Sequence, residues 1–145
     1  MSQREAALAA FFSAISGIAG VTVERNRDRP PEVGELPFLV QFDGGHVVAR
    51  PETETDNYTL TVEVEITVTA ATPAALGPAL NTLWADLVKA ATASPTLGDV
   101  VQEVRHRSLG DPEVLQDENE IPVMSATASF DVDFATLEDD PFTAP

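Results

Sequence analysis

The side chains best suited to acid–base chemistry near neutral pH are two histidines, His46 and His106. His46 follows Gly44 and Gly45 in an expected turn, and His106 stands between two arginines near the end of an expected strand. Neither has a neighbour at the spacing of a metal site or an acid–base pair, so we interpret both as polar residues without a catalytic role. The chain contains no cysteine, which excludes disulfides, thiolate nucleophiles and iron–sulfur clusters.

Carboxylates raise two further possibilities, a hydrolase pair and a calcium site. Glu63 and Glu65 alternate along one expected strand and share a face, as the paired carboxylates of a glycoside hydrolase would. No aromatic platform or polar pocket accompanies them in the sequence. The acidic run at 111–120 lacks the alternating ligands and central glycine of an EF-hand loop. We therefore expect an exposed strand face and solvated acidic loops, with no catalytic residue, metal or cofactor.

Five of the eight basic residues fall in two short groups, which are Arg25, Arg27 and Arg29, and Arg105 and Arg107. Arginines at alternate positions of a strand point to one side and concentrate positive charge there. In a chain with a net charge of −16, such a patch would dock acidic loops of a neighbouring copy through paired hydrogen bonds to carboxylates. The alternative is ion pairing within the surface of one chain, which contributes little free energy.

Length and composition indicate one globular domain. A chain of 145 residues with 43% hydrophobic and 22% charged residues can bury a core of its own. The charge of −16 makes the surface repel phosphate backbones and anionic lipid, so free DNA and membranes are poor partners. Residues 1–20 have the pattern of an amphipathic helix more than that of a secretory signal.

Two helices are expected to cover the apolar side of a sheet. The first spans about residues 3–16 and ends before Gly17. The second follows Thr72 and Pro73 and reaches about Thr92, with its regular part beginning near Gly77 because a proline follows.

Strict alternation of apolar and polar residues predicts two long, half-buried antiparallel strands, over 58–70 and over 123–134. Shorter strands are expected at 21–25, 38–42 and 100–106, and loops at 26–37, 46–57 and 109–120. The segment 46–57 reads either as a long hairpin loop or as a protruding arm.

This order of elements predicts an α+β fold, with an antiparallel or mixed sheet of about four to five strands and two helices packed on one face. We expect a single domain over residues 1–137 and a flexible acidic tail over 138–145.

The layout resembles the tail terminator, or tail completion, proteins of long-tailed bacteriophages and of tail-like gene transfer particles. The segments that carry the likeness are VTVERNRDRPPEVGELPFLVQFDG, YTLTVEVEITVTA running into TPAALGPALNTLWADLVKAA, SPTLGDVVQEVRHRS and VMSATASFDVDFATLEDDPF. The resemblance implies a structural virion protein that forms a ring, usually of six copies, on the last ring of the tail tube. Such a ring ends tube polymerisation and presents a docking surface.

The implied partners are further copies of the chain, the major tail tube protein and a head-completion or neck protein. The protein would be made in the host cytoplasm and lie at the tail/neck junction of the virion. DNA would pass through the ring without tight binding, which suits an acidic lumen.

By analogy, the arm 43–57, the polar face of strand 58–70 and the arginines are candidates for subunit or tube contacts. The candidate interface residues are Arg25, Arg27, Arg29, Arg50, Glu63, Glu65, Arg105 and Arg107. Three other functions stay open at this point. They are a neck or head–tail connector joining portal to tail, a small hydrolase or ligand-binding domain using the carboxylates, and an acidic DNA mimic or inhibitor.

Overall fold

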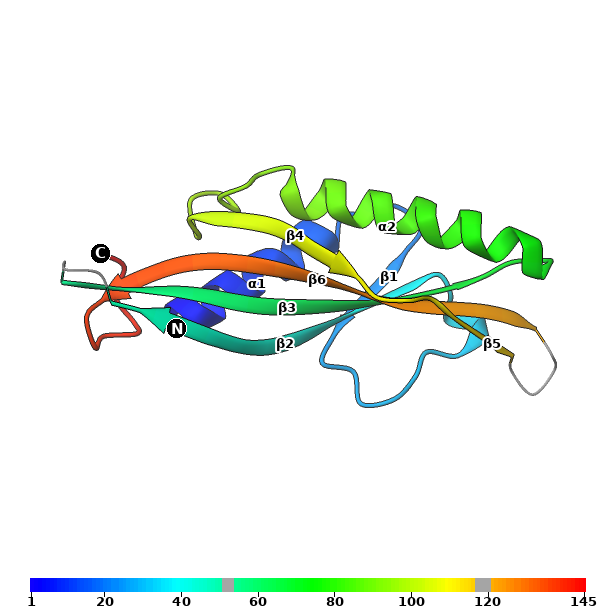
Figure 1. Cartoon of the computed structure of the whole chain (residues 1–145), viewed down its shortest axis with the longest axis horizontal. Helices are drawn as coiled ribbons and strands as arrows, with labels where there is room; N and C mark the ends of the chain where they lie inside the picture. Colours follow the sequence, from blue (N-terminus) through cyan, green and yellow to red (C-terminus); the bar gives the residue numbers. More distant parts are fainter. Residues whose placement is uncertain (51–53, 117–120) are drawn as a thin grey trace.

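The computed structural model describes residues 1–50, 54–116 and 121–145 (Figure 1). Its elements in chain order are α1 (Gln3–Ile15), β1 (Thr22–Arg25), η1 (Val33–Glu35), β2 (Phe38–Ala49), β3 (Thr55–Thr69), η2 (Pro73–Ala75), α2 (Leu76–Thr92), β4 (Glu103–Leu109), β5 (Glu113–Gln116) and β6 (Pro122–Leu137). Both helices and both long strands lie within three residues of their predicted bounds. The predicted start of the second helix near Gly77 is confirmed, after a short 3-10 turn.

The strands form one mixed sheet in the order β1-β2-β3-β6-β4, and β5 pairs with β6 next to β4. β1 and β2 run parallel, and the other neighbouring strands run antiparallel. The central pair, β3 and β6, stays in unbroken register from Thr55 opposite Leu137 to Thr69 opposite Val123. The expected α+β class is confirmed, with six strands in place of four to five.

Both helices pack on one face of this sheet and enclose the main core. Ser2 is the N-cap of α1, and its hydroxyl accepts a hydrogen bond from the backbone N–H of Glu5 at 3.1 Å. The ring of Phe11 in α1 meets the edge of Phe130 in β6, with ring centres 5.2 Å apart. The fully buried members of this core include Ala7, Phe11, Ile15, Leu39, Leu60, Val62, Val64, Ile66, Leu87, Ala91, Ala128, Phe130 and Val132.

The opposite face of the sheet is polar along β3 and β6 but covered at the start of β2. Phe38 lies opposite Thr67 in the register, on the side away from the helices, and yet it is fully buried. The guanidinium of Arg27, from the expected loop 26–37, lies 4.8 Å from the centre of the Phe38 ring. This loop therefore folds over the sheet and shields β2 on its second face.

The prediction that β2 ends at Phe42 is wrong. The strand continues through Asp43, Gly44 and Gly45 as a β-bulge and runs on to Ala49. A Cβ atom on Gly44 would stand 2.2 Å from the carbonyl oxygen of Thr61, so glycine permits the close approach of the two strands. The described part of the segment 46–57 is a hairpin extension of β2 and β3, and residues 51–53 lie outside the described residues.

The prediction of an exposed loop at 109–120 also needs correction. β4 begins at Glu103, not at residue 100, and runs to Leu109. Gly110 then donates its N–H to the carbonyl of Thr127 at 2.8 Å, and β5 follows beside β6. β4 and β5 together form one interrupted edge strand along β6, and residues 117–120 lie outside the described residues.

The molecule is elongated along its strands, with β2 and β3 reaching one end and β5 and β6 the other (Figure 1). The C-terminal residues lie at the first of these ends. Gln3 donates its backbone N–H to the carbonyl of Pro141 at 2.9 Å, and Glu138 donates to Glu54 at 3.0 Å. The flexible tail stays a prediction, and in this structure the segment contacts both α1 and the β2–β3 hairpin.

Candidate interaction surface

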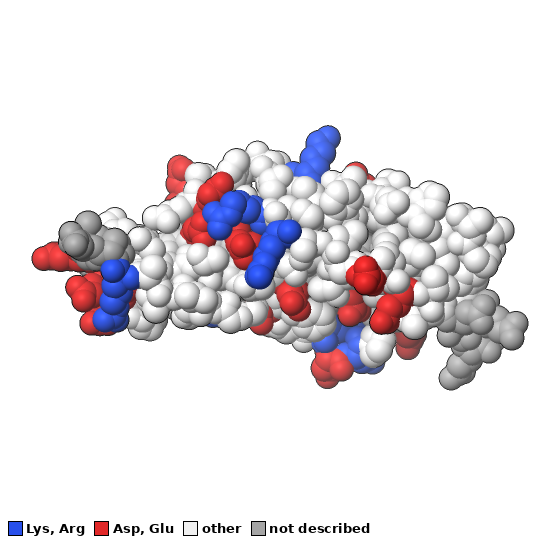
Figure 2. All heavy atoms as spheres, viewed as in Figure 1, with Lys and Arg blue, Asp and Glu red and all other residues white. Residues whose placement is uncertain are grey.

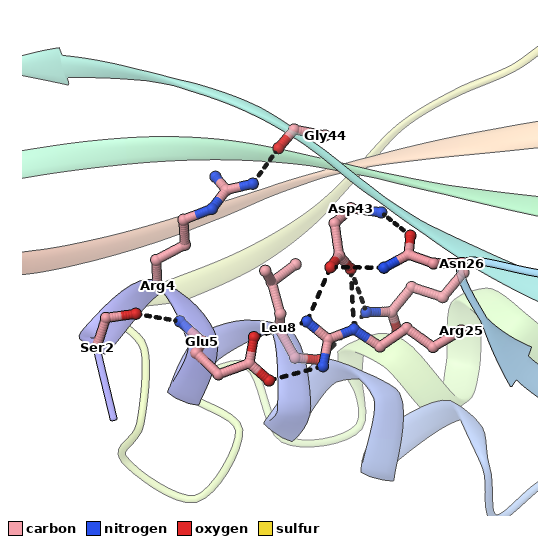
Figure 3. Close-up of polar contacts among 9 residues, drawn as sticks. Ser2, Arg4, Glu5, Leu8, Arg25, Asn26, Asp43 and Gly44 are labelled. Atoms are coloured by element: carbon pink, nitrogen blue, oxygen red, sulfur yellow. Dashed lines mark hydrogen bonds and ion pairs between the residues drawn. The ribbon is translucent and has the colours of Figure 1, made fainter.

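Arg25, at the end of β1, joins two other elements (Figure 3). Its guanidinium donates two hydrogen bonds to Glu5 of α1, at 2.7 and 2.8 Å, and two to Asp43 of β2, at 3.0 and 2.8 Å. The hydrogen bonds from Arg25 lower the pKa of Glu5. Burial by itself would raise the pKa of Asp43, but hydrogen bonds from Arg25 and Asn26 outweigh it and lower that pKa as well. Arg25 thus serves the fold of its own chain.

Arg4 lies beside the bulge of β2, next to this cluster (Figure 3). One of its nitrogens donates to the carbonyl of Gly44, and the other lies 2.9 Å from Nδ1 of His46. Burial, followed by the positive charge of Arg4, lowers the pKa of His46. The His46 ring also meets the ring of Tyr58 edge-on, with centres 5.0 Å apart. His46 therefore packs against the Tyr58 ring and the guanidinium of Arg4.

Arg27 and Arg29 follow β1 and do not continue its alternation. Arg27 pairs with Glu35 at 2.7 Å and with Glu24 at 2.9 Å, and its side chain is only 5% exposed. Arg29 is exposed and makes no ion pair with another described residue. The expected common patch of three arginines on one strand face is wrong, because β1 ends at Arg25 and the chain turns onto the opposite face.

Arg50 closes the β2–β3 hairpin against the C-terminal segment. It pairs with the buried carboxylate of Asp56 at 3.1 Å and also with Asp139. The second oxygen of Asp56 accepts the backbone N–H of Asp139 at 3.1 Å. Coulombic attraction, first from Asp139 and then from Asp56, raises the pKa of Arg50.

Arg105 and Arg107 lie on β4, at the other edge of the sheet from β1. Arg105 pairs with Asp133 and with Glu103, the latter at 2.9 Å. Arg107 lies 3.7 Å from Asp131. The two arginine groups are therefore separated by the width of the sheet. On the face drawn in Figure 2, most basic side chains lie in small groups together with acidic ones, and one projects alone from the upper edge.

Glu63 and Glu65 share the polar face of β3, as predicted. Glu63 is exposed and stands opposite Ser129, while Glu65 is half-buried and stands opposite Thr127. Neither makes an ion pair with another described residue. The two carboxylates thus lie on the polar face of the strand beside hydroxyl side chains.

The position of His106 was missed by sequence reasoning. Its ring lies on the helix side of β4, between Trp84 and Phe130, with ring centres 5.5 and 5.4 Å away. Nε1 of Trp84 donates a hydrogen bond to Nε2 of His106 at 3.2 Å. One feature of the sequence indicates this position. His106 lies between Arg105 and Arg107 on a strand, so its side chain points to the face opposite theirs.

Within residues 1–50, 54–116 and 121–145, no three His, Asp or Glu side chains gather in a way that could hold a metal ion. In the same part of the chain, no helix is both long and apolar enough to cross a membrane.

Comparison with known proteins finds similarity in structure and not in sequence. No protein-family model and no curated protein matches the sequence. One similar solved structure is described as the virion of a native gene transfer agent particle. It shares 16% sequence identity with this chain at a TM-score of 0.37, and the match covers 86% of this chain and 91% of that one. At this TM-score and identity the likeness assigns neither a family nor a function.

Proposed function

We propose that the protein works by assembly and not by catalysis, as a structural protein of a phage-like particle. Its specific role is that of a tail terminator, a ring of copies that caps the tail tube and ends its polymerisation. The same ring presents the docking surface for head-completion or neck proteins at the tail/neck junction. A neck or head–tail connector is the second candidate, since it needs the same kind of self-assembly.

The observation that carries this proposal is that apolar side chains are exposed at the edges of the sheet. Four of the large apolar side chains that face solvent lie on edge strands, and they are Val47 (73% exposed), Val48 (45%), Val114 (60%) and Leu115 (48%). Exposed apolar edges invite pairing with another chain, and proteins that stay monomeric guard them with charge, proline or bulges. In a protein that assembles, such an unpaired edge can bind a neighbouring subunit.

The charge of the chain supports the same role. With a net charge of −16, the protein repels the phosphate backbone of DNA. A ring of such subunits would let DNA pass without binding it tightly. The resemblance of the sequence segments to tail terminators supports the specific assignment to a ring on the tube.

Electron microscopy tests this proposal directly. The purified protein is mixed with growing tail tubes made from the tube protein of the same particle. We expect rings at one end of each tube and an arrest of elongation. Tubes of unchanged length with bare ends would contradict the terminator role, and binding to head-completion protein without tube capping would favour the connector.

A further inference from the structure

The outer edge of β2 is covered along its first part. β1 pairs with residues 38–41 only, over four residues. Beyond it, Asn26 donates its backbone N–H to Gln41 at 2.7 Å and accepts the N–H of Asp43 on its side-chain oxygen at 3.0 Å. Arg4 then donates to the carbonyl of Gly44. The edge is therefore closed up to the bulge.

Past the bulge, the β2 edge at 46–49 is bare. Its outer side meets no other strand among the described residues. The segment reads His-Val-Val-Ala and contains no carboxylate, lysine, arginine or proline. Val47 and Val48, on opposite faces of the strand, are 73% and 45% exposed. The bulge lies just before this segment, between Asp43 and His46, and within the segment no carboxylate, lysine, arginine or proline opposes pairing with another strand.

A second bare edge of the same length lies on β5. Glu113–Gln116 pairs with β6 on one side and with no described strand on the other. Val114 and Leu115 are 60% and 48% exposed. β4, on the same side of β6, differs because charged side chains line its exposed positions, namely Glu103, Arg105 and Arg107. Among the described strands, 46–49 and β5 are thus the two edges with adjacent exposed apolar side chains, and Glu113 is the one carboxylate within them.

The two bare segments cannot meet within one chain. Val47 is level with Thr59 and Asp133, whereas Leu115 is level with Val123. Asp133 and Val123 are ten residues apart on β6, which is roughly 33 Å of strand. The segments also lie on opposite edges of the sheet. Contact between them therefore joins one copy to the next, in a head-to-tail manner.

The faces of the two segments match in an antiparallel alignment. Val47 and Leu115 both lie on the polar face of the sheet, and Val48 and Val114 both lie on the helix face. Placing Val47 opposite Leu115 puts Val48 opposite Val114, so apolar side chains meet on both sides.

The charges beside the two segments that are not paired within the chain have opposite signs. Arg4 lies at the start of 46–49 and makes no ion pair with a described carboxylate, whereas Arg50, at its end, is paired with Asp56 and Asp139. Asp111 precedes β5 and Glu113 is its first residue, and neither makes an ion pair with a described residue.

We infer that copies of this protein join by strand addition, with 46–49 of one copy paired antiparallel to Glu113–Gln116 of the next. This inference rests on the proposed function, because the occupant of each edge is a second copy of the chain. The contact is heterologous, so repeated addition closes into a ring when the rotation between copies permits it.

Paired cysteines test the contact, because the chain has no cysteine of its own. Opposed residues on neighbouring strands are close enough for a disulfide, which requires Cα atoms within roughly 7 Å. Val47→Cys combined with Leu115→Cys, and Val48→Cys combined with Val114→Cys, should yield covalent ladders on mild oxidation. Val47→Cys combined with Val114→Cys is the matched control, and its two thiols on opposite faces should give at least tenfold less product.

Lysine substitutions at the two edges provide the second test. Val47→Lys and Leu115→Lys should each abolish oligomers in mass photometry and analytical ultracentrifugation, with circular dichroism unchanged. Val100→Lys, at a valine that is 38% exposed in a turn, introduces the same charge away from both edges and should assemble like the wild type.

The outcomes separate the two proposals. Wild-type rings that form without crosslinks at 47–115, or with equal crosslinks in the control, would overturn the strand pairing and leave the terminator role standing. A wild-type protein that stays monomeric both alone and with tail tubes would overturn both.

Discussion

At the scale of single residues, most of the charge in this chain holds its own fold together. Arg25 ties α1 to the β1–β2 edge, and Arg50 ties the hairpin to the C-terminal segment. Arg27 is almost fully covered, stacked on Phe38 and paired with two glutamates. The sequence had left pairing within one chain and docking between copies as equal alternatives, and for these three arginines the structure shows contacts within the chain.

Replacing Arg25 by methionine should lower the free energy of unfolding at pH 7 by about 1–2 kcal/mol, because Asp43 loses its ionic partner in a half-buried place. The lowered pKa values of Glu5 and Asp43 mean that their contribution is complete above the ordinary carboxylate range. It is lost as pH falls through the folded-state values. Urea unfolding should therefore show the difference from wild type shrinking between pH 5 and pH 3.

Arg29→Met is the matched control for that measurement. Arg29 is exposed and makes no ion pair with a described residue, so its replacement should change stability by less than about 0.5 kcal/mol at either pH. A difference for Arg25→Met that stays constant with pH would contradict the ionic explanation.

At the scale of elements, the bulge in β2 decides how far the sheet extends. The sequence Asp43-Gly44-Gly45 is typical of a turn, and as a turn it would have ended the strand. In the structure Gly44 lies against Thr61, Arg4 holds its carbonyl, and the strand continues into the bare segment 46–49.

Gly44→Ala should therefore destabilise the protein by about 1–3 kcal/mol, since the new methyl group would overlap the Thr61 carbonyl. Gly45→Ala is the neighbouring control, because a Cβ atom there meets no atom within 4 Å. Thermal unfolding followed by Trp84 fluorescence measures both. Equal stability of the two variants would show that the strands do not approach at Gly44 as described.

At the scale of the whole molecule, an acidic body carries apolar edges at opposite ends (Figure 1). Copies with a net charge of −16 repel one another at low ionic strength, and salt screens that repulsion. Strand addition through apolar side chains and backbone hydrogen bonds does not depend on attraction between arginine and carboxylate patches. The two modes of association thus respond to salt in opposite directions.

Raising the salt concentration from 0.05 to 0.5 M should therefore increase the oligomeric fraction of the protein, as measured by sedimentation at constant protein concentration. Association that weakens with salt would point instead to docking between exposed arginines and acidic loops. The Leu115→Lys variant should remain monomeric throughout this range, and its assembly at high salt would count against strand addition.

The sequence by itself determined the elements with a regular period. Alternation along β3 and β6 and the apolar stripe of α2 each bury one continuous set of side chains, and burial of apolar surface is the dominant favourable term in folding. A local pattern was therefore enough to place these elements and the α+β class.

Only the tertiary structure decided what the irregular segments do. Phe38 is buried because the loop that carries Arg27 folds over it. The β2 bulge depends on contacts with Thr61 and Arg4. β5 forms because it pairs with β6. Each of these depends on residues far apart in the chain, which no local period reveals. The two bare edges could not be predicted for the same reason, since a segment is an edge only when no other strand pairs with its outer side.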